Sequence, residues 1–377
     1  MKKICFVATI PAVVNSFLRD HIQAAAEKYE VTVVCSDEDK YLLSGLNARV
    51  IFTPIKRKPS PWQDLRTVFE LAKLFHQEKF EIVHTHMPKT ALLGMLAAWL
   101  TCVPIRINTF HGEVWATRSG LVRTLFKSLD RLIVSLATHI LVVSPSQRDF
   151  LIKEGVLTPG KANLIGSGSI CGVDSLRFKP DTNAKESIRE DLGISQDAIV
   201  ILFVGRLNRD KGMLDLAEAF SYISKQQGNV DLLLVGAEED VPFVQIKDIC
   251  SNHSARLHYV KFTKKPEAYM AAADIFCLPS YREGLPMTTL EAAACCVPSV
   301  ASRIYGITDA VIEGETGVLF TAGDIEGLTK ALLKLIEDYS LRQELGLKAR
   351  LRVIDQFQSQ KITNAMMMFY NQLLKGY

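Results

Sequence analysis

The sequence predicts an α/β protein made of two successive domains, each built around a parallel β-sheet. Short apolar, β-branched runs alternate with segments of helix length, which is typical of buried parallel strands in βα units. The runs form two series, separated by a polar stretch without hydrophobic periodicity, "CGVDSLRFKPDTNAKES" (171–187). The chain has 377 residues. That length suits two domains of roughly 100–200 residues each.

The expected strands are the mostly apolar runs of each series. In the first series they are 3–9, 30–36, 48–54, 81–86, 105–110, 139–144 and 162–166. In the second series they are 198–205, 230–236, 256–260, 273–280, 297–302 and 316–321. Parallel sheets of this kind bind ligands at the carboxyl ends of their strands. We therefore expect the functional residues in the loops that follow the strands, with a cleft between two facing domains.

Charge is unevenly distributed along the chain. Residues 1–178 hold 22 Lys and Arg against 15 Asp and Glu, whereas the remainder holds 22 against 26. The basic first half indicates an anionic partner or surface, and the net charge of only +3 argues against a nucleic-acid-binding protein.

The N-terminus superficially resembles a signal peptide, but its apolar run is short and reaches Pro11 early. A buried first strand explains it better. The longest weakly polar stretch, 91–105, is shorter than the roughly 20 residues of a membrane span. We expect a cytoplasmic protein without a transmembrane helix, peripheral on the inner face of the cell membrane through its basic half.

The segment "LPSYREGLPMTTLEAAACCVPSVAS" (278–302) is the most informative one. It predicts a strand that ends near Leu278, a tight loop, and a helix that starts near Pro286, a residue suited to the first turn. The first amides of that helix, from Leu285 to Thr288, form an anion site suited to phosphate. Glu283 precedes the helix and Glu291 lies inside it. Each carboxylate suits the vicinal diol of a sugar, one on either side of a diphosphate.

The segment "ILFVGRLNRDKGMLDLAEAF" (201–220) predicts a buried strand that ends at Gly205 and a helix that begins near Gly212. Arg206 and Lys211 lie in the loop between them. Two cations at the carboxyl end of a strand neutralise a diphosphate, and they stabilise the charge of a departing nucleoside diphosphate.

These two segments resemble family 4 of the retaining glycosyltransferases, which have the GT-B fold and an E-x(7)-E signature. Glu283 and Glu291 match that signature, and "VGRLNRDKG" (204–212) matches the family's diphosphate motif. "ILVVSPSQRDFL" (140–151) and "GVDSLRFKP" (172–180) match the end of its first domain and the entry to its second. The resemblance is co-linear over nearly the whole chain.

The resemblance implies two Rossmann-like domains with parallel sheets facing across a cleft. Residues 1–178 would form the acceptor domain, residues 179–360 the nucleotide-sugar donor domain, and residues 361–377 a helix crossing back to the first domain.

The resemblance also implies roles for individual residues. Arg206 and Lys211 would bind the donor diphosphate, Glu291 the ribose, and Glu283 the donor sugar. His111 in "NTFHGEVW" matches a family histidine near the reaction centre, and with Glu283 it is the expected catalytic residue. The remaining expected donor-binding residues follow Glu283 in the chain: Gly284, Leu285, Pro286, Met287 and Thr288.

The first half should bind the acceptor, through Asn15, His86 and Lys89. Of His84 and His86, both at one strand end, we expect one to line the cleft and the other to be structural. The loop after the first strand, "ATIPAVVNSFLRD" (8–20), lacks the glycines that many family members carry, which leaves the acceptor contacts open.

Two basic segments of the first half, 55–62 and 118–139, suggest a surface for an anionic bilayer. Arg123, Lys127 and Arg131 lie at nearly helical spacing in the second of them. An ordinary amphipathic helix packed on its sheet explains these residues equally well.

No metal or cofactor is expected. The cysteines lack zinc-site spacing, the acidic run Asp37–Glu38–Asp39 fits a solvated loop, and the cations and helix amides already balance the diphosphate charge.

The sequence thus predicts a retaining glycosyltransferase that moves a hexose or N-acetylhexosamine from a nucleoside diphosphate to a hydroxyl. The expected acceptor is a lipid-linked or growing glycan, such as a polyprenyl diphosphate sugar, in cell-surface polysaccharide synthesis. The alternatives are a sugar-nucleotide epimerase of the same fold and a non-catalytic sugar-nucleotide binding protein. A dehydrogenase is disfavoured because no G-x-G-x-x-G follows the first strand.

Overall fold

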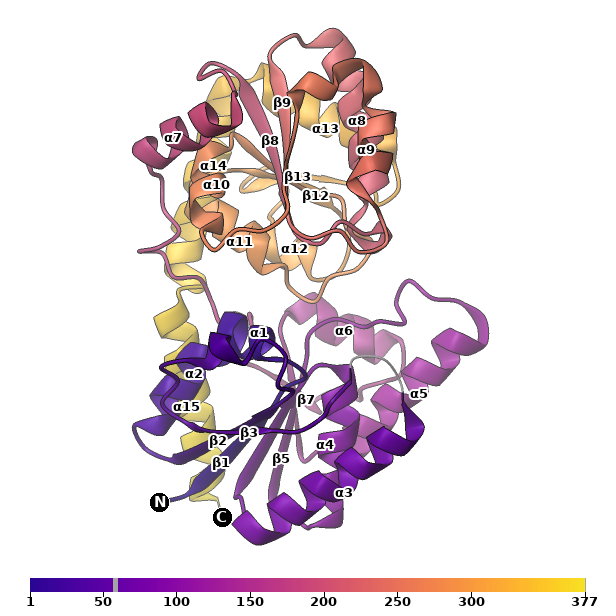
Figure 1. Ribbon diagram of the computed structural model, residues 1–377, viewed down its shortest axis with the longest axis vertical. Helices are drawn as coiled ribbons and strands as arrows, with labels where there is room; N and C mark the ends of the chain where they lie inside the picture. Colours follow the sequence, from indigo (N-terminus) through magenta and orange to yellow (C-terminus); the bar gives the residue numbers. More distant parts are fainter. Residues whose placement is uncertain (57–59, 377) are drawn as a thin grey trace. The chain divides into compact units, whose positions relative to one another are not determined.

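The protein is described here by a computed structural model that covers residues 1–56 and 60–376, with the backbone alone at residues 252 and 253. The chain forms two compact units, Met1–Gly172 with Ser359–Tyr377, and Val173–Gln358 (Figure 1). The first unit ends at Gly172 rather than at residue 178, because Val173 belongs to the second unit: its amide donates to the carbonyl of Phe357 over 2.7 Å. The last helix begins at Ser359 and belongs to the first unit.

The first unit contains a seven-stranded parallel sheet in the order β3-β2-β1-β4-β5-β6-β7. Its strands are β1 (Lys3–Val7), β2 (Glu30–Cys35), β3 (Arg49–Phe52), β4 (Ile82–His86), β5 (Ile105–Phe110), β6 (His139–Val142) and β7 (Ala162–Leu164). The inner strands are almost wholly buried, as the apolar runs of the sequence predict.

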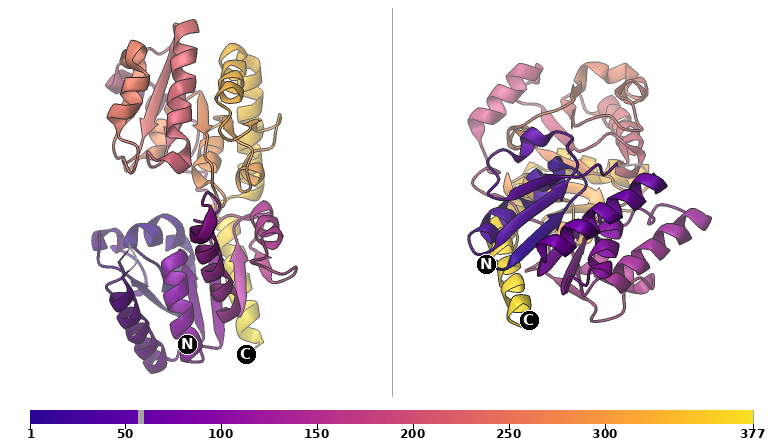
Figure 2. Two further views of the ribbon diagram at one scale, coloured as in Figure 1. Left: turned by 90° about the vertical axis from the view of Figure 1, so that its right-hand side faces the viewer. Right: turned by 60° about the horizontal axis from the view of Figure 1, so that its bottom comes forward.

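Helices cover both faces of this sheet (Figures 1 and 2). They are α1 (Pro11–Val13), η1 (Val14–Leu18), α2 (Arg19–Ala26), η2 (Lys40–Leu43), α3 (Pro61–Glu78), α4 (Pro88–Leu100), α5 (Gly120–Leu136), α6 (Pro145–Lys153) and α15 (Ser359–Lys375). The helices α3, α4 and α5 pack side by side in that order, and α15 packs against α2. The C-terminal helix is therefore a structural part of the first unit.

The second unit contains a six-stranded parallel sheet in the order β10-β9-β8-β11-β12-β13. Its strands are β8 (Ile199–Val204), β9 (Val230–Val235), β10 (Leu257–Val260), β11 (Ile275–Leu278), β12 (Ser299–Ser302) and β13 (Gly317–Phe320). The helices are α7 (Thr182–Leu192), η3 (Arg209–Lys211), α8 (Met213–Gln226), α9 (Phe243–Ile249), η4 (Ser251–Arg256), α10 (Pro266–Ala272), α11 (Met287–Ala294), α12 (Ile307–Ala310), α13 (Ile325–Glu337) and α14 (Tyr339–Gln356).

Each sheet reverses its strand order at one point, between β1 and β4 in the first unit and between β8 and β11 in the second. At such a point the connections leave to opposite sides, and the carboxyl ends of the two strands frame a crevice. Many of the expected site residues lie at the ends of these four strands or in the loops and helices that follow them: Asn15, His86, Lys89, Arg206, Lys211, Glu283 and Glu291.

The predicted fold class is confirmed, and every expected strand is present. Two expected irregular segments are wrong. The stretch after β1 is helical from Pro11 onward and includes the π-helical turn Val14–Leu18. The expected linker 171–187 is shorter than predicted, because helix α7 begins at Thr182, where its N-cap Asp181 accepts a hydrogen bond from the Ala184 amide.

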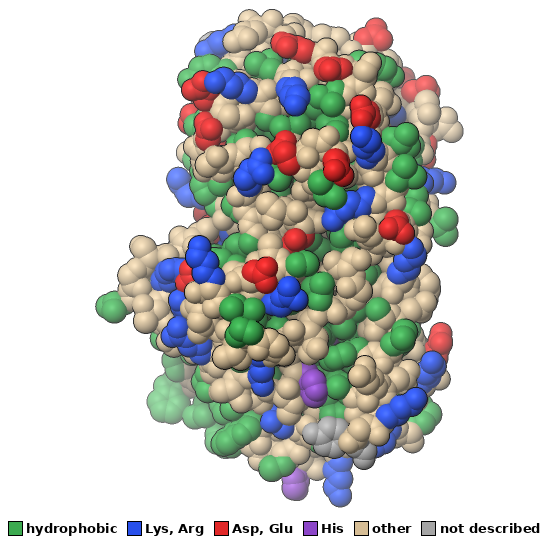
Figure 3. Space-filling model, turned by 180° about the vertical axis from the view of Figure 1, so that it is seen from behind, with side chains coloured by type: hydrophobic (Ala, Val, Ile, Leu, Met, Phe, Trp, Pro, Cys, Tyr) green, Lys and Arg blue, Asp and Glu red, His purple; other side chains and the backbone are tan. Residues whose placement is uncertain are grey.

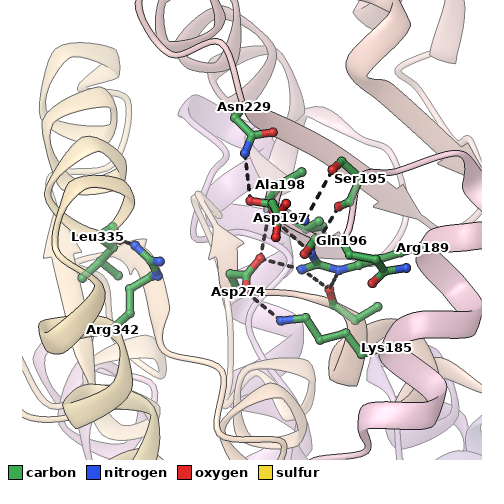
Figure 4. A network of polar contacts seen from close by, with 12 residues as sticks. Lys185, Arg189, Ser195, Gln196, Asp197, Ala198, Asn229, Asp274, Leu335 and Arg342 are labelled. Atoms are coloured by element: carbon green, nitrogen blue, oxygen red, sulfur yellow. Dashed lines mark hydrogen bonds and ion pairs between the residues drawn. The ribbon is translucent and has the colours of Figure 1, made fainter.

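A buried polar network fixes α7 to the second sheet, at the end of the strands opposite to the crevice (Figure 4). Arg189 is 1% exposed and donates to the Asp274 carboxylate over 2.7 Å and to the carbonyls of Ala198 and Ala272. Asp274 also accepts from Lys185 and from the Val200 amide. Because Arg189 has several partners in addition to its counter-ion, burying its charge is compensated, and the network supports the fold.

Candidate active site

The loops after β8 and β11 meet at the reversal point of the second sheet. Gly212, at the end of η3, has a φ of +68°, and a Cβ added there would lie 2.1 Å from the carbonyl oxygen of Pro279. Only glycine permits both that backbone conformation and that approach. The close approach brings the 3₁₀ turn Arg209–Lys211 next to the loop that carries Glu283.

Lys211 and Glu283 form the central ion pair of this site. The Lys211 Nζ lies 2.5 Å from Glu283 Oε1, and the Ser280 hydroxyl donates to the same oxygen over 2.8 Å. The side chain of Asn208 holds the Lys211 amide over 2.9 Å. The two side chains remain 23% and 11% exposed. A positively charged amine and a carboxylate thus lie together at the sheet edge, both within reach of a ligand.

A second ion pair joins the same two loops. Arg282 Nη2 contacts Asp210 Oδ2 at 2.9 Å, and the Tyr281 amide donates to the Asp210 carbonyl over 2.8 Å. These contacts hold the turn that carries Lys211 against the loop that carries Glu283, so the Lys211–Glu283 pair is supported on both sides.

Arg206 lies at the rim of the same crevice, where its side chain is 60% exposed. Its guanidinium pairs with Glu239, which follows β9, at 2.5 Å, and Asn208 Nδ2 donates to the other oxygen of Glu239 over 2.6 Å. An exposed ion pair of this kind contributes only about 0–1 kcal/mol. Arg206 therefore loses little when it exchanges Glu239 for another anion.

The helix expected near Pro286 is α11, which begins one residue later than expected, at Met287. Pro286 is its N-cap residue, so it precedes the first turn. Gly284, Leu285, Pro286 and Met287 are buried, and Thr288 is half-buried. A helix N-terminus concentrates amide dipoles and is suited to a phosphate group. Gly306 closes the loop from the other side, since a Cβ there would lie 2.4 Å from the Gly284 carbonyl oxygen.

Glu291 lies one turn into α11 and is half-buried. The pKa of Glu291 is raised to about 7, chiefly by loss of water around the carboxyl group; the cation of Arg177 opposes this rise and the charge of Glu267 adds to it. Arg177 and Glu267 are themselves paired at 2.8 Å. A carboxyl group with such a pKa changes charge near neutrality, which is typical of functional sites.

In the first unit, His86 at the end of β4 lies next to His111, which follows β5. The pairing of the two strands matches His86 with Thr109, two residues before His111. His86 Nδ1 and His111 Nε2 are 3.1 Å apart. His86 is fully buried, whereas His111 keeps part of its surface exposed. Burial lowers the pKa of His111 to about 3 and that of His86 well below its usual value, so both rings are neutral at pH 7.

His84 is also fully buried and has structural partners on both ring nitrogens. Its Nδ1 lies 2.6 Å from the Tyr370 hydroxyl of α15, and its Nε2 lies 2.7 Å from the Thr109 hydroxyl. His84 therefore ties the last helix to the sheet. His86, the expected cleft-lining member of the pair, is itself buried and contacts His111, which is partly exposed.

The backbone at this strand end is strained. Met87, between His86 and the first residue of α4, has φ 69° and ψ 144°, a combination that is essentially restricted to glycine. Such strain persists only where the surroundings hold it, and it clusters at functional sites. A small cavity next to it is lined by Asn108, His111, Trp115 and Asp130 among others.

The remaining acceptor-side residues have local partners. Asn15 lies in the π-helical turn after β1, is exposed, and accepts a hydrogen bond from Arg19 over 2.8 Å. Lys89 in the first turn of α4 pairs with Asp64 of α3 at 2.6 Å. The acidic run Asp37–Glu38–Asp39 is exposed after β2. Within the described part of the chain, no cluster of three or more His, Cys, Asp or Glu residues is arranged to hold a metal ion.

Two of the three cations of helix α5, Arg123 and Lys127, face the protein, whereas Arg131 is exposed. Arg123 and Lys127 both pair with Glu154, at 2.9 and 2.7 Å, and lie over the ring of the buried Trp115. Arg131 donates to the carbonyl of Gly155. In the other basic segment, residues 57–59 lie outside the described residues.

Sequence reasoning missed three contacts of these residues: Arg206 with Glu239, His84 with Tyr370, and His86 with His111. Glu239 and His111 follow strands, and Tyr370 bonds to a residue of β4, so the order of the strands in each sheet is needed to predict these contacts. The acidic run "AEED" (237–240) after a strand was the available signal for Glu239.

Two family models match the chain. Residues 14–168 match the model described as Glycosyltransferase Family 4, and residues 184–352 match that described as Glycosyl transferases group 1.

Similar curated proteins include the capsular polysaccharide biosynthesis glycosyltransferase CapM of Staphylococcus aureus, which is 30% identical and aligned over 95% of this chain and 94% of its own length. They also include the Escherichia coli UDP-Gal:alpha-D-GlcNAc-diphosphoundecaprenol alpha-1,3-galactosyltransferase, which is 30% identical over 83% of this chain and 81% of its own.

Two solved structures share the fold over the whole length. Sucrose-phosphate synthase from Thermosynechococcus elongatus superposes with a TM-score of 0.84, at 22% identity and full coverage of both chains. Anabaena HepE in complex with UDP-glucose superposes with a TM-score of 0.82, at 19% identity, over 99% of this chain and 100% of its own.

Proposed function

Because the chain belongs to glycosyltransferase family 4 and is a sugar-transferring enzyme, we propose that the crevice of its second unit binds the nucleotide-sugar donor. The observation that carries this proposal is the Lys211–Glu283 pair at the strand-order reversal, beside the N-terminus of α11. A cation and a helix N-terminus side by side suit a diphosphate, and a carboxylate next to them suits a sugar diol.

In this proposal Lys211 and Arg206 neutralise the diphosphate, and Glu291 accepts hydrogen bonds from the ribose. Glu283 and the adjoining backbone hold the transferred sugar, a hexose or N-acetylhexosamine. Glu283 is an orienting group rather than a covalent nucleophile, because Lys211 and Ser280 already occupy one of its oxygens. The departing phosphate accepts the proton of the attacking hydroxyl. The new glycosidic bond therefore forms on the same face of the sugar from which the nucleoside diphosphate leaves.

No metal is needed in this scheme. Lys211, Arg206 and the amides of the first turn of α11 supply the positive charge that a divalent cation supplies elsewhere.

We propose a lipid-linked glycan as the acceptor, in cell-surface polysaccharide synthesis. The names of two similar proteins include a lipid-linked sugar. One is the E. coli galactosyltransferase above. The other is the Campylobacter jejuni N,N'-diacetylbacillosaminyl-diphospho-undecaprenol alpha-1,3-N-acetylgalactosaminyltransferase, which is 25% identical over 99% of this chain. His111, which follows β5, and its neighbour His86, at the end of β4, form the proposed acceptor side. Neither alternative, epimerase or binding protein, has a comparable observation in its favour.

The test is a mass-spectrometric transfer assay. The enzyme is incubated with a panel of UDP, GDP and dTDP sugars, each with and without polyprenyl-diphosphate-linked acceptors. We expect one donor to give an acceptor heavier by one sugar residue, with release of the nucleoside diphosphate. An epimerised free sugar formed without any acceptor would replace the proposal by the epimerase alternative.

A lipid-linked acceptor requires the enzyme to reach a bilayer surface. No helix within the described residues combines the length and apolar character of a membrane span. The outer surface of α3 and α5 instead exposes large apolar side chains, with Trp62 and Leu121 at 87% and 88%. The others on these two helices are Leu65, Phe69, Val122, Leu125 and Leu132.

Exposed basic residues accompany this apolar surface, among them Arg66, Lys73 and Arg118. In the space-filling view from behind, green and blue side chains lie together on the flank of the first unit that carries α5 (Figure 3). Apolar side chains that enter the headgroup region, together with cations, suit an anionic bilayer. The membrane side of α5 is thus its apolar outer face, not its cationic inner face.

Replacing Leu121 and Leu125 together with glutamate should release the protein from anionic vesicles. Each leucine loses its apolar contribution and each glutamate is repelled by the lipid charge, so we expect partitioning to fall at least about tenfold. Flotation with phosphatidylglycerol-containing vesicles measures it. Leu176→Glu in the second unit, at a leucine that is 84% exposed, is the control and should float like the wild type. A wild-type protein that stays at the bottom of the gradient would contradict the proposed surface.

A further inference from the structure

We infer that His86 is a positioning residue: it donates a hydrogen bond to His111 and thereby holds His111 in the tautomer that carries its proton on Nδ1. His111 then presents an N–H donor at its accessible nitrogen. This inference rests on the proposed role of His111 on the acceptor side, and it adds a residue and a protonation state to that role.

The first step of the argument is the contact itself. His86 Nδ1 and His111 Nε2 are 3.1 Å apart, within hydrogen-bond distance, and burial keeps both imidazoles neutral. A neutral imidazole has one N–H and one lone pair. One ring must therefore donate and the other accept, and two arrangements exist: either His86 donates from Nδ1, or His111 donates from Nε2.

The second step is the far nitrogen of His86. His86 Nε2 is fully buried and has no hydrogen-bond partner within the described residues. If His111 donated, the proton of His86 would be on Nε2 and a buried N–H would have no acceptor. Buried N–H groups without partners are rarer in proteins than under-satisfied acceptors. The arrangement with a lone pair on His86 Nε2 and the proton on Nδ1 is therefore favoured.

The third step is the far nitrogen of His111. Its Nε2 accepts from His86, so the proton of His111 lies on Nδ1. Within the described part of the chain Nδ1 has no protein partner, yet it is not among the buried unsatisfied atoms, and part of His111 is exposed. It follows that this N–H faces solvent and is available to an oxygen atom of a sugar.

The surroundings hold His86 in this position. Its ring stacks on Phe6 with ring centroids 6.4 Å apart and lies against His84 at 4.2 Å. The Thr90 hydroxyl is hydrogen-bonded to the His86 carbonyl, and Met87 follows in its strained conformation. A buried, tightly packed neutral ring is suited to fixing the tautomer of a partner whose other edge is open.

Histidine-selective ¹⁵N and ¹³C labelling with NMR tests the inference, because the shifts of the ring nuclei distinguish the two tautomers. The resonances of His111 are those that are absent from the spectrum of His111→Gln. In the wild type we expect the Nδ1–H form of His111. In His86→Leu we expect the Nε2–H form to appear as well, and kcat to fall about three- to tenfold, the effect of losing one hydrogen bond. His86→Asn, which places an amide nitrogen near the position of Nδ1, should restore both.

His21→Leu is the matched control, since His21 is also a buried histidine of the first unit but bonds to Thr363 and to the Ile170 carbonyl. It should lower stability and leave the tautomer of His111 unchanged. An Nε2–H form of His111 in the wild type, or an unaltered His111 pattern in both His86 variants, would overturn the inference while the donor assay still succeeds. Full turnover of His111→Gln would instead remove the proposed role of His111, whatever its tautomer.

Discussion

Replacing Lys211 with alanine should lower kcat/KM for the nucleotide sugar about 100- to 1,000-fold, the loss expected when a preorganised group that stabilises transition-state charge is removed. Lys211 pairs with Glu283 at 2.5 Å, and its backbone amide is held by the side chain of Asn208, the N-cap of η3. In the proposed reaction negative charge grows on the departing diphosphate, and Lys211 neutralises it. Steady-state kinetics measure the loss in kcat/KM, and calorimetric titration with the nucleoside diphosphate measures the loss in its affinity.

Arg209→Ala is the matched control for charge, because Arg209 lies on the same 3₁₀ turn and is exposed. It should keep donor affinity and turnover within about a factor of two, as surface substitutions usually do. Equal losses in Arg209→Ala and Lys211→Ala would mean that general charge steering, rather than a contact of Lys211, explains the effect. Unchanged kinetics in Lys211→Ala would contradict the proposed donor site.

Glu291→Gln should weaken nucleotide-sugar binding about 10- to 100-fold at pH 8, the range for hydrogen bonds to a charged group. In the wild type, affinity should rise with pH through about 7, because the pKa of Glu291 is raised to about 7 and only the carboxylate accepts from both ribose hydroxyls. The intact nucleotide sugar is the right probe, since its diphosphate is a diester without a proton to lose in this range. Affinity measured from pH 6 to pH 8.5 should show this step in the wild type and none in Glu291→Gln.

The same pKa predicts the opposite sign for stability. The pKa of about 7 in the folded protein exceeds the ordinary glutamate value of 4.5, so the native state binds the proton more tightly than the unfolded chain. The contribution of the protonated Glu291 to the free energy of unfolding is fully present below pH 4.5 and is lost as pH rises through 7. Glu291→Gln should therefore have a higher Tm than the wild type at pH 8 while binding the donor less well. Glu218→Gln, at an exposed position of α8, should change neither. A lower Tm in Glu291→Gln would show that its loss of function is a folding defect.

The fold was predictable because its signal is local. Parallel strands buried on both faces, such as β8 and β11, appear as continuous apolar runs, and helix-length segments separate them. The first helical turn after β1 was not predictable in the same way. Its sequence, "PAVVNSFL" (11–18), has neither a capping side chain nor a simple period that would indicate a helix with a π-helical turn.

The helix α7 shows a different limit. Its N-cap Asp181 and its C-terminal Gly193, in the left-handed conformation, were present as sequence signals. The helix nevertheless lacks the apolar face that predicts packing against a sheet, because Arg189, the residue that fixes α7 to its sheet, is charged yet buried. A hydrophobic pattern cannot identify a helix that is held to its sheet by a buried ion pair.

The candidate site was predictable residue by residue but not as pairs. Lys211 and Glu283 are far apart in the chain, and their contact depends on β8 and β11 being neighbours in the sheet. Charge alone also misplaced two of the cations of α5. Arg123 and Lys127 lie at a spacing that suits a surface, and only the position of Glu154 and Trp115 shows that they face inward.

The central claim is that the crevice between the ends of β8 and β11 binds the donor diphosphate. A crystal structure of the enzyme with a bound nucleotide sugar tests it most directly. We predict diphosphate oxygens within hydrogen-bond distance of Lys211 Nζ and of the first amides of α11, with the ribose hydroxyls on the Glu291 carboxylate. A diphosphate bound elsewhere, with the Lys211–Glu283 pair untouched, would contradict the account.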